Sequence, residues 1–182
     1  MTSVPKMNKE GLLSWQNTLM WEMDAPDKDG NRVDVVMDEL NNIDRISFIK
    51  YVHDKNWGLL VPSCIHTGDD LISYAMNMPA NKLYIIAMPK SSTADVPAST
   101  IATSLVKGIN TLKQGILFTT KRTGEIKTIP KPNIIIIATT GTLPLRCIPD
   151  EWKKWMLGGE EEDELKEYAE NVPEPRDCYN CY

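Results

Sequence analysis

Apolar positions along the chain alternate between helical spacing and nearly continuous runs, and this alternation predicts most of the secondary structure. Helical spacing predicts helices over 9–23, 45–56, 98–115 and the later part of 58–78, the third of them interrupted or ended near Gly108. Apolar runs predict strands over 33–37, 82–92 and 131–144, with two short strands around a Thr-Gly-Glu turn within 116–129. Residues 149–157 form a short amphipathic segment, and residues 158–170 predict a linker followed by a charged helix or disorder.

Buried strands that alternate with helices indicate an α/β fold, in which a largely parallel sheet is covered by helices on both faces. Ligands of such sheets bind beyond the carboxyl ends of the strands. Three loops take that position here, "MDELNNID" (37–44), "AMPKSS" (87–92) and "ATTGTL" (138–143). We therefore expect any site to be built from these loops.

The length of 182 residues favours one compact domain, which we place at 1–157 and which is followed by an acidic tail over 158–182. Residues 159–182 contain nine acidic and two basic residues, a net charge of −7, so the total of −5 leaves +2 for residues 1–158. A slightly basic body permits contact with nucleic acid without requiring it.

The sequence offers no sign of a membrane or metal partner. No apolar run approaches the roughly 20 residues of a membrane span. The N-terminal residues lack the apolar core of a secretory signal, which favours an intracellular protein, in the cytoplasm or the nucleus. Cys178 and Cys181 form a C-x-x-C pair, but zinc needs two more ligands, and Cys64 and His66 would supply them only if the fold brought them close. We expect no metal site.

Six segments carry a resemblance by their order and spacing: "LLSWQNTL" (12–19), "NRVDVVMDELNNIDRISFIKYV" (31–52), "YIIAMPKS" (84–91), "INTLKQGILFTTKRTG" (109–124), "PNIIIIATT" (132–140) and "PDEWKKWML" (149–157). Together they resemble the superfamily 3 helicase domain, a P-loop domain of the AAA+ type, of the replication-initiator (Rep) proteins of circular single-stranded DNA viruses. The second segment is similar to the Walker A strand, loop and helix, the third to the Walker B strand, the fifth to the motif C strand and the sixth to the arginine-finger segment. The resemblance implies a P-loop NTPase-like parallel sheet sandwiched by helices.

The positions that match the Walker A loop lack its chemistry. Asn41 and Asp44 stand at the glycine positions, with Asn42 in the same turn, and glycine is needed there because backbone N–H groups approach the phosphates closely. Asp44 would add a carboxylate, and like charges 4 Å apart repel by roughly 4 kcal/mol at an effective dielectric of about 20. Arg45 replaces the lysine, and Ile46 replaces the hydroxyl that binds Mg²⁺.

Three further positions that match the family's motifs have also changed. Ala87 stands at the Walker B acid, Thr139 at the motif C asparagine and Glu151 at the arginine finger. An anion at the last position opposes the stabilisation that a cation gives to a transferring phosphoryl group. We therefore expect a catalytically inactive domain without cofactors, acting as a structural, regulatory or nucleic-acid-binding subunit. A residual or unorthodox ATP-dependent helicase using ATP and Mg²⁺, and a scaffold that binds protein without nucleic acid, are the alternatives.

The resemblance also implies partners. It suggests a homo-oligomeric ring, or assembly with active homologues, and contact with single-stranded nucleic acid through Lys113, Lys121 and Arg122. The other interpretation of these three residues is a solvated edge of a two-stranded ribbon. Trp152 and Trp155 could stack on bases, but packing in the core is favoured.

Overall fold

The structure is a computed structural model that describes residues 15–19, 32–38, 45–54, 58–89, 96–121, 123–157 and 165–167, except for the side chains at 45–47, 49–50 and 165–166. Residues 15–19 are helical. The elements that follow are β1 (Val33–Asp38), α2 (Arg45–Asp54), β2 (Leu59–Val61), α3 (Gly68–Asn77), β3 (Leu83–Ala87), α4 (Ala98–Gln114), β4 (Ile116–Leu117), β5 (Lys127–Thr128), β6 (Asn133–Ala138), the 3₁₀ helix η1 (Leu145–Cys147), β7 (Lys153–Leu157) and β8 (Leu165–Glu167).

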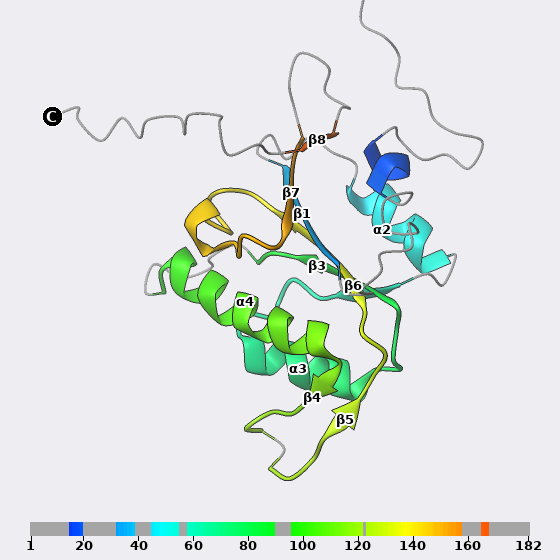
Figure 1. The fold of residues 1–182 in the computed structure, drawn as a ribbon, viewed down its shortest axis with the longest axis vertical. Coiled ribbons are helices and arrows are strands. Elements are labelled where there is room, and N and C mark those ends of the chain that lie inside the picture. Colours follow the sequence, from blue (N-terminus) through cyan, green and yellow to red (C-terminus); the bar gives the residue numbers. More distant parts are fainter. Residues whose placement is uncertain are drawn as a thin grey trace, which may run out of the picture.

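Five parallel strands in the order β2-β3-β6-β1-β7 form the centre of the molecule, and β8 pairs antiparallel with β7 at one edge (Figure 1). The chain crosses the sheet in one direction from β1 to β2 and returns in the other through β3, β6 and β7. Because crossovers between parallel strands are right-handed, the connection after β1 must lie on the opposite face from those that return. Accordingly, α2 lies on one face, and α3, α4 and η1 lie on the other. The predicted α/β fold with helices on both faces of a parallel sheet is confirmed.

Successive residues of each strand face two separate cores, as the pleat of a strand requires. On the α3–α4 face, Val35, Ile86 and Ile136 lie in one cluster of buried side chains. On the α2 face, Val36 and Ile137 pack with Phe48 and with Trp15 of the helical residues 15–19. The rings of Trp15 and Phe48 lie 5.4 Å apart between centroids. This contact fixes the first helical residues against α2.

Helix α4 runs unbroken through Gly108, so the predicted interruption there is wrong. A Cβ atom on Gly108 would lie 2.5 Å from the Cα of Gly68, in the first turn of α3. The glycine therefore allows two helix backbones to touch and does not end a helix. Helix α4 ends at Gly115, whose φ of 76° is left-handed and whose N–H donates to the Leu112 carbonyl.

The last two strands differ from the prediction. Residues 153–157 form β7, the fifth parallel strand, where only an amphipathic segment was expected. Residues 165–167 form β8, where a charged helix or disorder was expected. Without β8 the outer edge of β7 would present unpaired backbone groups, and β8 satisfies them. The sheet thus extends beyond residue 157, where we placed the end of the domain.

Candidate functional site

Three strand ends that the sequence singles out lie side by side at the carboxyl edge of the sheet. Ala87 of β3 pairs with Ile137 of β6, and Met37 of β1 pairs with Ala138. One position further along, Asp38 and Thr139 close the ends of β1 and β6. By the alternation of each strand, Ala87, Thr139 and Asp38 belong to the face that α2 covers. The structure therefore brings together the positions predicted to correspond to Walker B and motif C, next to the strand that leads into the segment predicted to correspond to Walker A.

Most of the Walker A segment lies outside the described part of the chain. This applies to Asn41, Asn42 and Asp44, and the backbone of Arg45 and Ile46 is described without its side chains. Arg45 is the first residue of α2, so the predicted change from turn to helix occurs where the sequence placed it. The connection that follows β1 passes to the face of α2, and the connection that follows the neighbouring strand β6 passes to the face of η1. Parallel sheets bind ligands at the carboxyl edge where two neighbouring connections diverge in this way.

The polar groups of Thr139 form hydrogen bonds within the turn that follows β6. Its hydroxyl accepts a hydrogen bond from the N–H of Thr142 at 3.2 Å, and its N–H donates to the Thr142 hydroxyl at 2.9 Å. The Thr142 hydroxyl donates in return to the Thr139 carbonyl at 3.1 Å. This reciprocal pairing stabilises the turn after β6 and engages the hydroxyl of Thr139 in the turn itself.

A buried carboxylate, that of Asp38, lies at the carboxyl edge. Asp38 ends β1 with only 2% of its surface exposed. Leu157, at the end of β7, pairs with both Asp38 and Leu165 of β8. Residues 158–164, which contain five acidic residues, join β7 to β8 in the sequence and lie outside the described residues.

Glu151 lies elsewhere. It is exposed and precedes β7, whose first residues pair with Asp34 at the opposite, amino-terminal part of β1. Trp152 and Trp155, on either side of the start of β7, are both buried, which agrees with the packing interpretation. The indole N–H of Trp155 donates to Asp34 at 3.0 Å, and the Arg32 guanidinium holds the same carboxylate at 2.7 Å.

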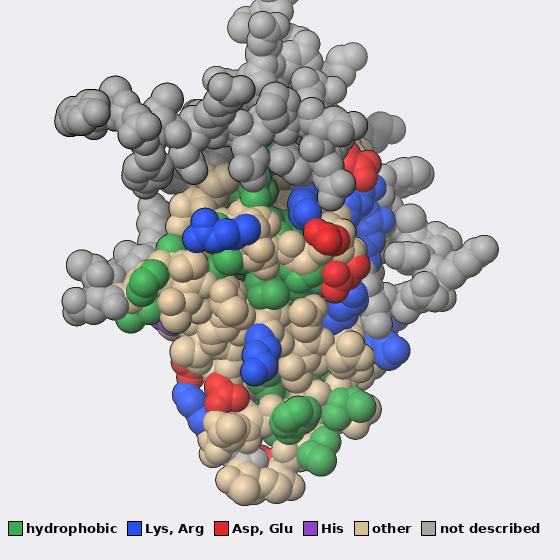
Figure 2. Space-filling view, turned by 60° about the vertical axis from the view of Figure 1, so that its left-hand side comes forward, with side chains coloured by type: hydrophobic (Ala, Val, Ile, Leu, Met, Phe, Trp, Pro, Cys, Tyr) green, Lys and Arg blue, Asp and Glu red, His purple; other side chains and the backbone are tan. Residues whose placement is uncertain are grey.

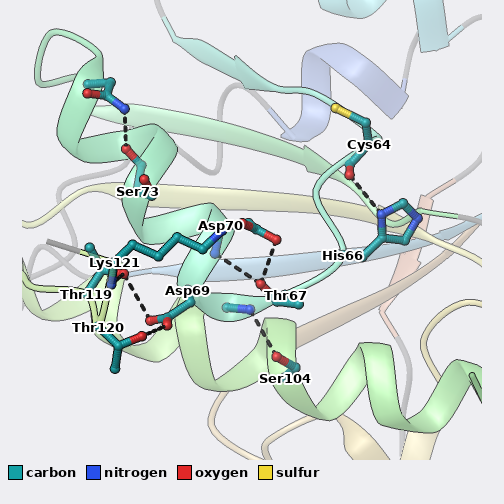
Figure 3. Close-up of polar contacts among 12 residues, drawn as sticks. Cys64, His66, Thr67, Asp69, Asp70, Ser73, Ser104, Thr119, Thr120 and Lys121 are labelled. Carbon is teal, nitrogen blue, oxygen red and sulfur yellow. Dashed lines mark hydrogen bonds and ion pairs between the residues drawn. The ribbon is translucent and has the colours of Figure 1, made fainter.

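The antiparallel pair β4 and β5, which with the turn joining them we call the ribbon (residues 116–128), projects from the amino-terminal end of the sheet (Figure 1). Polar side chains hold its tip on the first turn of α3 (Figure 3). The hydroxyls of Thr119 and Thr120 both donate to Asp69, the former at 3.1 Å, and the ammonium of Lys121 contacts Asp70. The hydrogen bond from Thr120 lowers the pKa of Asp69, and that from Lys121 lowers the pKa of Asp70.

The base of the ribbon is fixed on the other end of the same helix. Lys127 of β5 points its ammonium at the last carbonyls of α3 and donates to those of Met78, Met76 and Ala75 at 2.6, 3.2 and 3.4 Å. A cation is favoured there because the carbonyls at a helix C-terminus lack partners within the helix. The ribbon is therefore held at both ends of α3, and it is a preformed element.

The outer face of the ribbon is apolar. Alternate residues point inward and outward, so Leu117 is buried while Ile116 and Phe118 are 51% and 60% exposed. The pairing of Ile116 with Thr128 and of Leu117 with Lys127 places Phe118 opposite Ile126, which is 70% exposed. We call Ile116, Phe118 and Ile126 the apolar patch. Figure 2 shows hydrophobic side chains gathered at this lower end of the molecule.

The predicted nucleic-acid residues lie around this ribbon. Lys113 lies in the last turn of α4, which leads directly into β4, and Lys121 lies in the turn with its ammonium on Asp70. Arg122 lies outside the described residues. Neither the apolar patch nor the contacts with α3 follow from a pattern in the sequence. Its only available signal was the pair Asp69–Asp70 after Thr67, which is typical of a helix start.

The structure contains no metal centre within its described part, where no group of three or more His, Cys, Asp or Glu side chains could hold an ion. Cys64 and His66 are local neighbours, since Nδ1 of His66 lies 2.8 Å from the Cys64 carbonyl oxygen. Cys178 and Cys181 lie outside the described residues. Among the helices that the structure describes, none has the length and apolar character needed to cross a membrane.

Comparison of the chain with models of protein families, with curated proteins and with solved structures gave no match.

Proposed function

We propose that the chain is a superfamily 3 helicase-like P-loop domain that has kept the fold without hydrolysing nucleotide, and that it acts as a binding subunit. The observation that carries the proposal is the carboxyl edge of β3, β6 and β1. Three motifs can act on one nucleotide only if their strands are neighbours, and these three are. Yet Ala87 offers no carboxylate and the hydroxyl of Thr139 is engaged by Thr142. The positions that correspond to the motifs thus lie together, but their side chains do not supply the groups that nucleotide hydrolysis needs.

Electrostatics supports the same conclusion. Polyphosphate binding needs cations and free backbone N–H groups at the start of the helix after β1. Here Asp38 is buried at the end of β1, and Asp44 precedes α2 in the sequence. A single like-charge pair at 4 Å costs roughly 4 kcal/mol at an effective dielectric of about 20, which is about half of a micromolar binding energy.

The surface that supports binding is the ribbon at the other end of the sheet. Residues 113–131 contain five basic residues and one acidic residue. Phe118 offers an exposed ring, and stacking of a base on an aromatic side chain contributes about 1–3 kcal/mol. Because the ribbon is held on α3 at both ends, little conformational entropy is lost when a ligand binds. We assign single-stranded nucleic acid to this surface.

The nucleotide half of the proposal is tested by thermal unfolding with and without Mg²⁺-ATP or Mg²⁺-ADP. A nucleotide that bound only the native state, at 100 times its Kd, would stabilise that state by about 2.7 kcal/mol and raise the unfolding midpoint. Because we propose that nucleotide does not bind, we expect an unchanged midpoint. The matched positive control is the variant Asp44→Gly, Arg45→Lys, Ile46→Thr, Ala87→Asp, which should gain a shift. Stabilisation of the wild type together with phosphate release would instead indicate an unorthodox ATPase.

The nucleic-acid half is tested with a fluorescent thymidine 20-mer at two salt concentrations. We expect weak, salt-dependent binding, and Phe118→Ala should reduce affinity by about 10-fold, since one stacked base is lost. Leu60→Ala, which truncates an exposed leucine on the edge strand β2, is the matched control and should leave affinity unchanged. If the oligonucleotide does not bind at low salt, the nucleic-acid role is wrong and the scaffold alternative holds.

A further inference from the structure

The apolar patch and the acidic tail have complementary chemistry. The ribbon segment 113–131 has a net charge of +4, which becomes +2 when Asp69 and Asp70 beneath it are included. Residues 168–182 contain three tyrosines and three acidic residues, with one arginine, and so have a net charge of −2. Aromatic rings combined with negative charges are two features that single-stranded nucleic acid also has. A surface suited to one of these ligands is therefore suited to the other.

Three exposed apolar side chains gather on one face of the ribbon, where they offer a surface to a partner. Ile116, Phe118 and Ile126 are each more than half exposed, and they lie together on one face because of the register of β4 and β5. Contiguous exposed apolar side chains on a rigid element mark interaction sites. The contacts of Lys127, Thr119 and Lys121 with α3 prevent the ribbon from turning this face inward.

The end of β8 at Glu167, from which the tail continues in the sequence, favours contact with a second copy. Strand β8 ends at Glu167 at one end of the molecule, and the ribbon lies at the other (Figure 1). Fifteen residues span at most about 50 Å when fully extended. A domain of this size is about 40 Å across. A tail that crossed its own domain would use nearly all of its length and keep few residues for contact, whereas a second copy can approach the ribbon directly.

We propose that residues 168–182 of one copy bind the apolar patch of a second copy, with the tyrosines packed on Phe118 and Ile126 and the acids facing Lys113 and Lys131, which flank the ribbon in the sequence. This inference rests on the proposed function, because the tail then competes with nucleic acid for the same surface. The contact joins one end of a chain to the opposite end of the next, so it is heterologous. Such contacts close into rings or continue as filaments.

Self-association is measured by analytical ultracentrifugation at about 50 and about 500 mM salt, between which the Debye length falls about three-fold. We expect an average mass above the 20.6 kDa of one chain at low salt, and a return towards it at high salt. The full-length variant Tyr168→Ser, Tyr179→Ser, Tyr182→Ser and the variant Phe118→Ser, Ile126→Ser should both stay at one chain. Leu60→Ser, an exposed leucine away from the ribbon, is the control and should associate as the wild type does.

A labelled peptide of residues 168–182 separates the remaining outcomes. It should bind the full chain, and Phe118→Ser, Ile126→Ser should weaken binding by about five-fold or more. A single-chain mass at both salts with no peptide binding overturns the inference, and so does association that both variants leave unchanged. A single-chain mass combined with tighter peptide binding by the tyrosine variant would mean that each tail covers its own ribbon, and it also overturns the inference.

The thymidine 20-mer separates this inference from the proposed function. If the tail competes, the tyrosine variant should bind the oligonucleotide at least about three-fold more tightly than the wild type at low salt. Patch-dependent self-association without any oligonucleotide binding would retain the tail contact and refute the nucleic-acid role. Oligonucleotide binding without self-association would do the reverse.

Discussion

The contact between Gly108 and Gly68 gives the sharpest test of the packing. In an isolated helix, Gly108→Ala would stabilise by about 1 kcal/mol, because alanine is the better helix former. In this structure the new Cβ would lie 2.5 Å from the Cα and 2.9 Å from the carbonyl oxygen of Gly68. Ordinary contacts of a Cβ begin near 3.4 Å, so α3 and α4 must separate by about 1 Å.

The magnitude decides between these opposing effects. Both clashing atoms belong to the backbone, so no side chain can rotate away. We therefore take the upper part of the overpacking range, about 3 kcal/mol. After the helix gain of about 1 kcal/mol, the free energy of unfolding should fall by about 2 kcal/mol, which lowers the midpoint of a domain of this size by about 4–8 °C.

Thermal and urea unfolding followed by circular dichroism measure this effect. Gly141→Ala is the matched control, because its Cβ would meet only the Thr139 hydroxyl, at an ordinary 3.6 Å, and its stability should change by less than about 0.5 kcal/mol. A Gly108→Ala protein as stable as the wild type would refute the close approach of the two helices.

Three further predictions concern polar contacts. Lys127→Met should lower the free energy of unfolding in urea by about 1–2 kcal/mol, since the carbonyls at the C-terminus of α3 lose their donor. The exposed Lys131→Met is the control and should have no such effect. Equal effects of the two substitutions would refute the stabilisation of α3 by Lys127. The pKa of Asp70 is lowered in the native state, so its stabilisation is complete above about pH 4 and is lost as the pH falls below that value. Unfolding midpoints between pH 6 and 3 should therefore fall less steeply for Asp70→Asn than for the wild type, and parallel curves would contradict this. Trp155→Phe should cost about 1–3 kcal/mol, because the buried Asp34 loses an indole donor, and an unchanged urea midpoint would exclude that contribution.

The parallel strands that could be predicted are those whose burial is complete on both faces. Residues 134–138 are an unbroken apolar run and residues 33–37 are interrupted only by the buried Asp34, because each side of the sheet is covered. Strands β6 and β1 follow these segments closely. Strand β7 was missed because Lys153 and Lys154 interrupt its apolar pattern. Lys153 lies with its ammonium 4.3 Å from the centre of the Trp155 ring, so a charged residue accompanies a buried strand without being buried itself.

The candidate site shows a different limit of sequence reasoning. The chain positions of Ala87 and Thr139 follow from the order of segments, and their proximity follows from the register of β3 and β6. The engagement of Thr139 by Thr142 depends on how one turn closes, which residue types alone do not specify. The contact between Asp69 and Thr119 joins residues 50 positions apart, and no local pattern predicts a contact at that separation.

The central place of β1 has a consequence for how the molecule is made. Val33 pairs with Ile134 and Asp34 with Lys153, so the partner strands of β1 are synthesised only about 100 residues after β1 itself. During synthesis β1 therefore has two open edges and an apolar run that pairs readily with other strands. A chain that stopped before Leu157 would leave one of these edges open permanently. The pairing partners of β1 thus set the shortest length at which both of its edges can be covered.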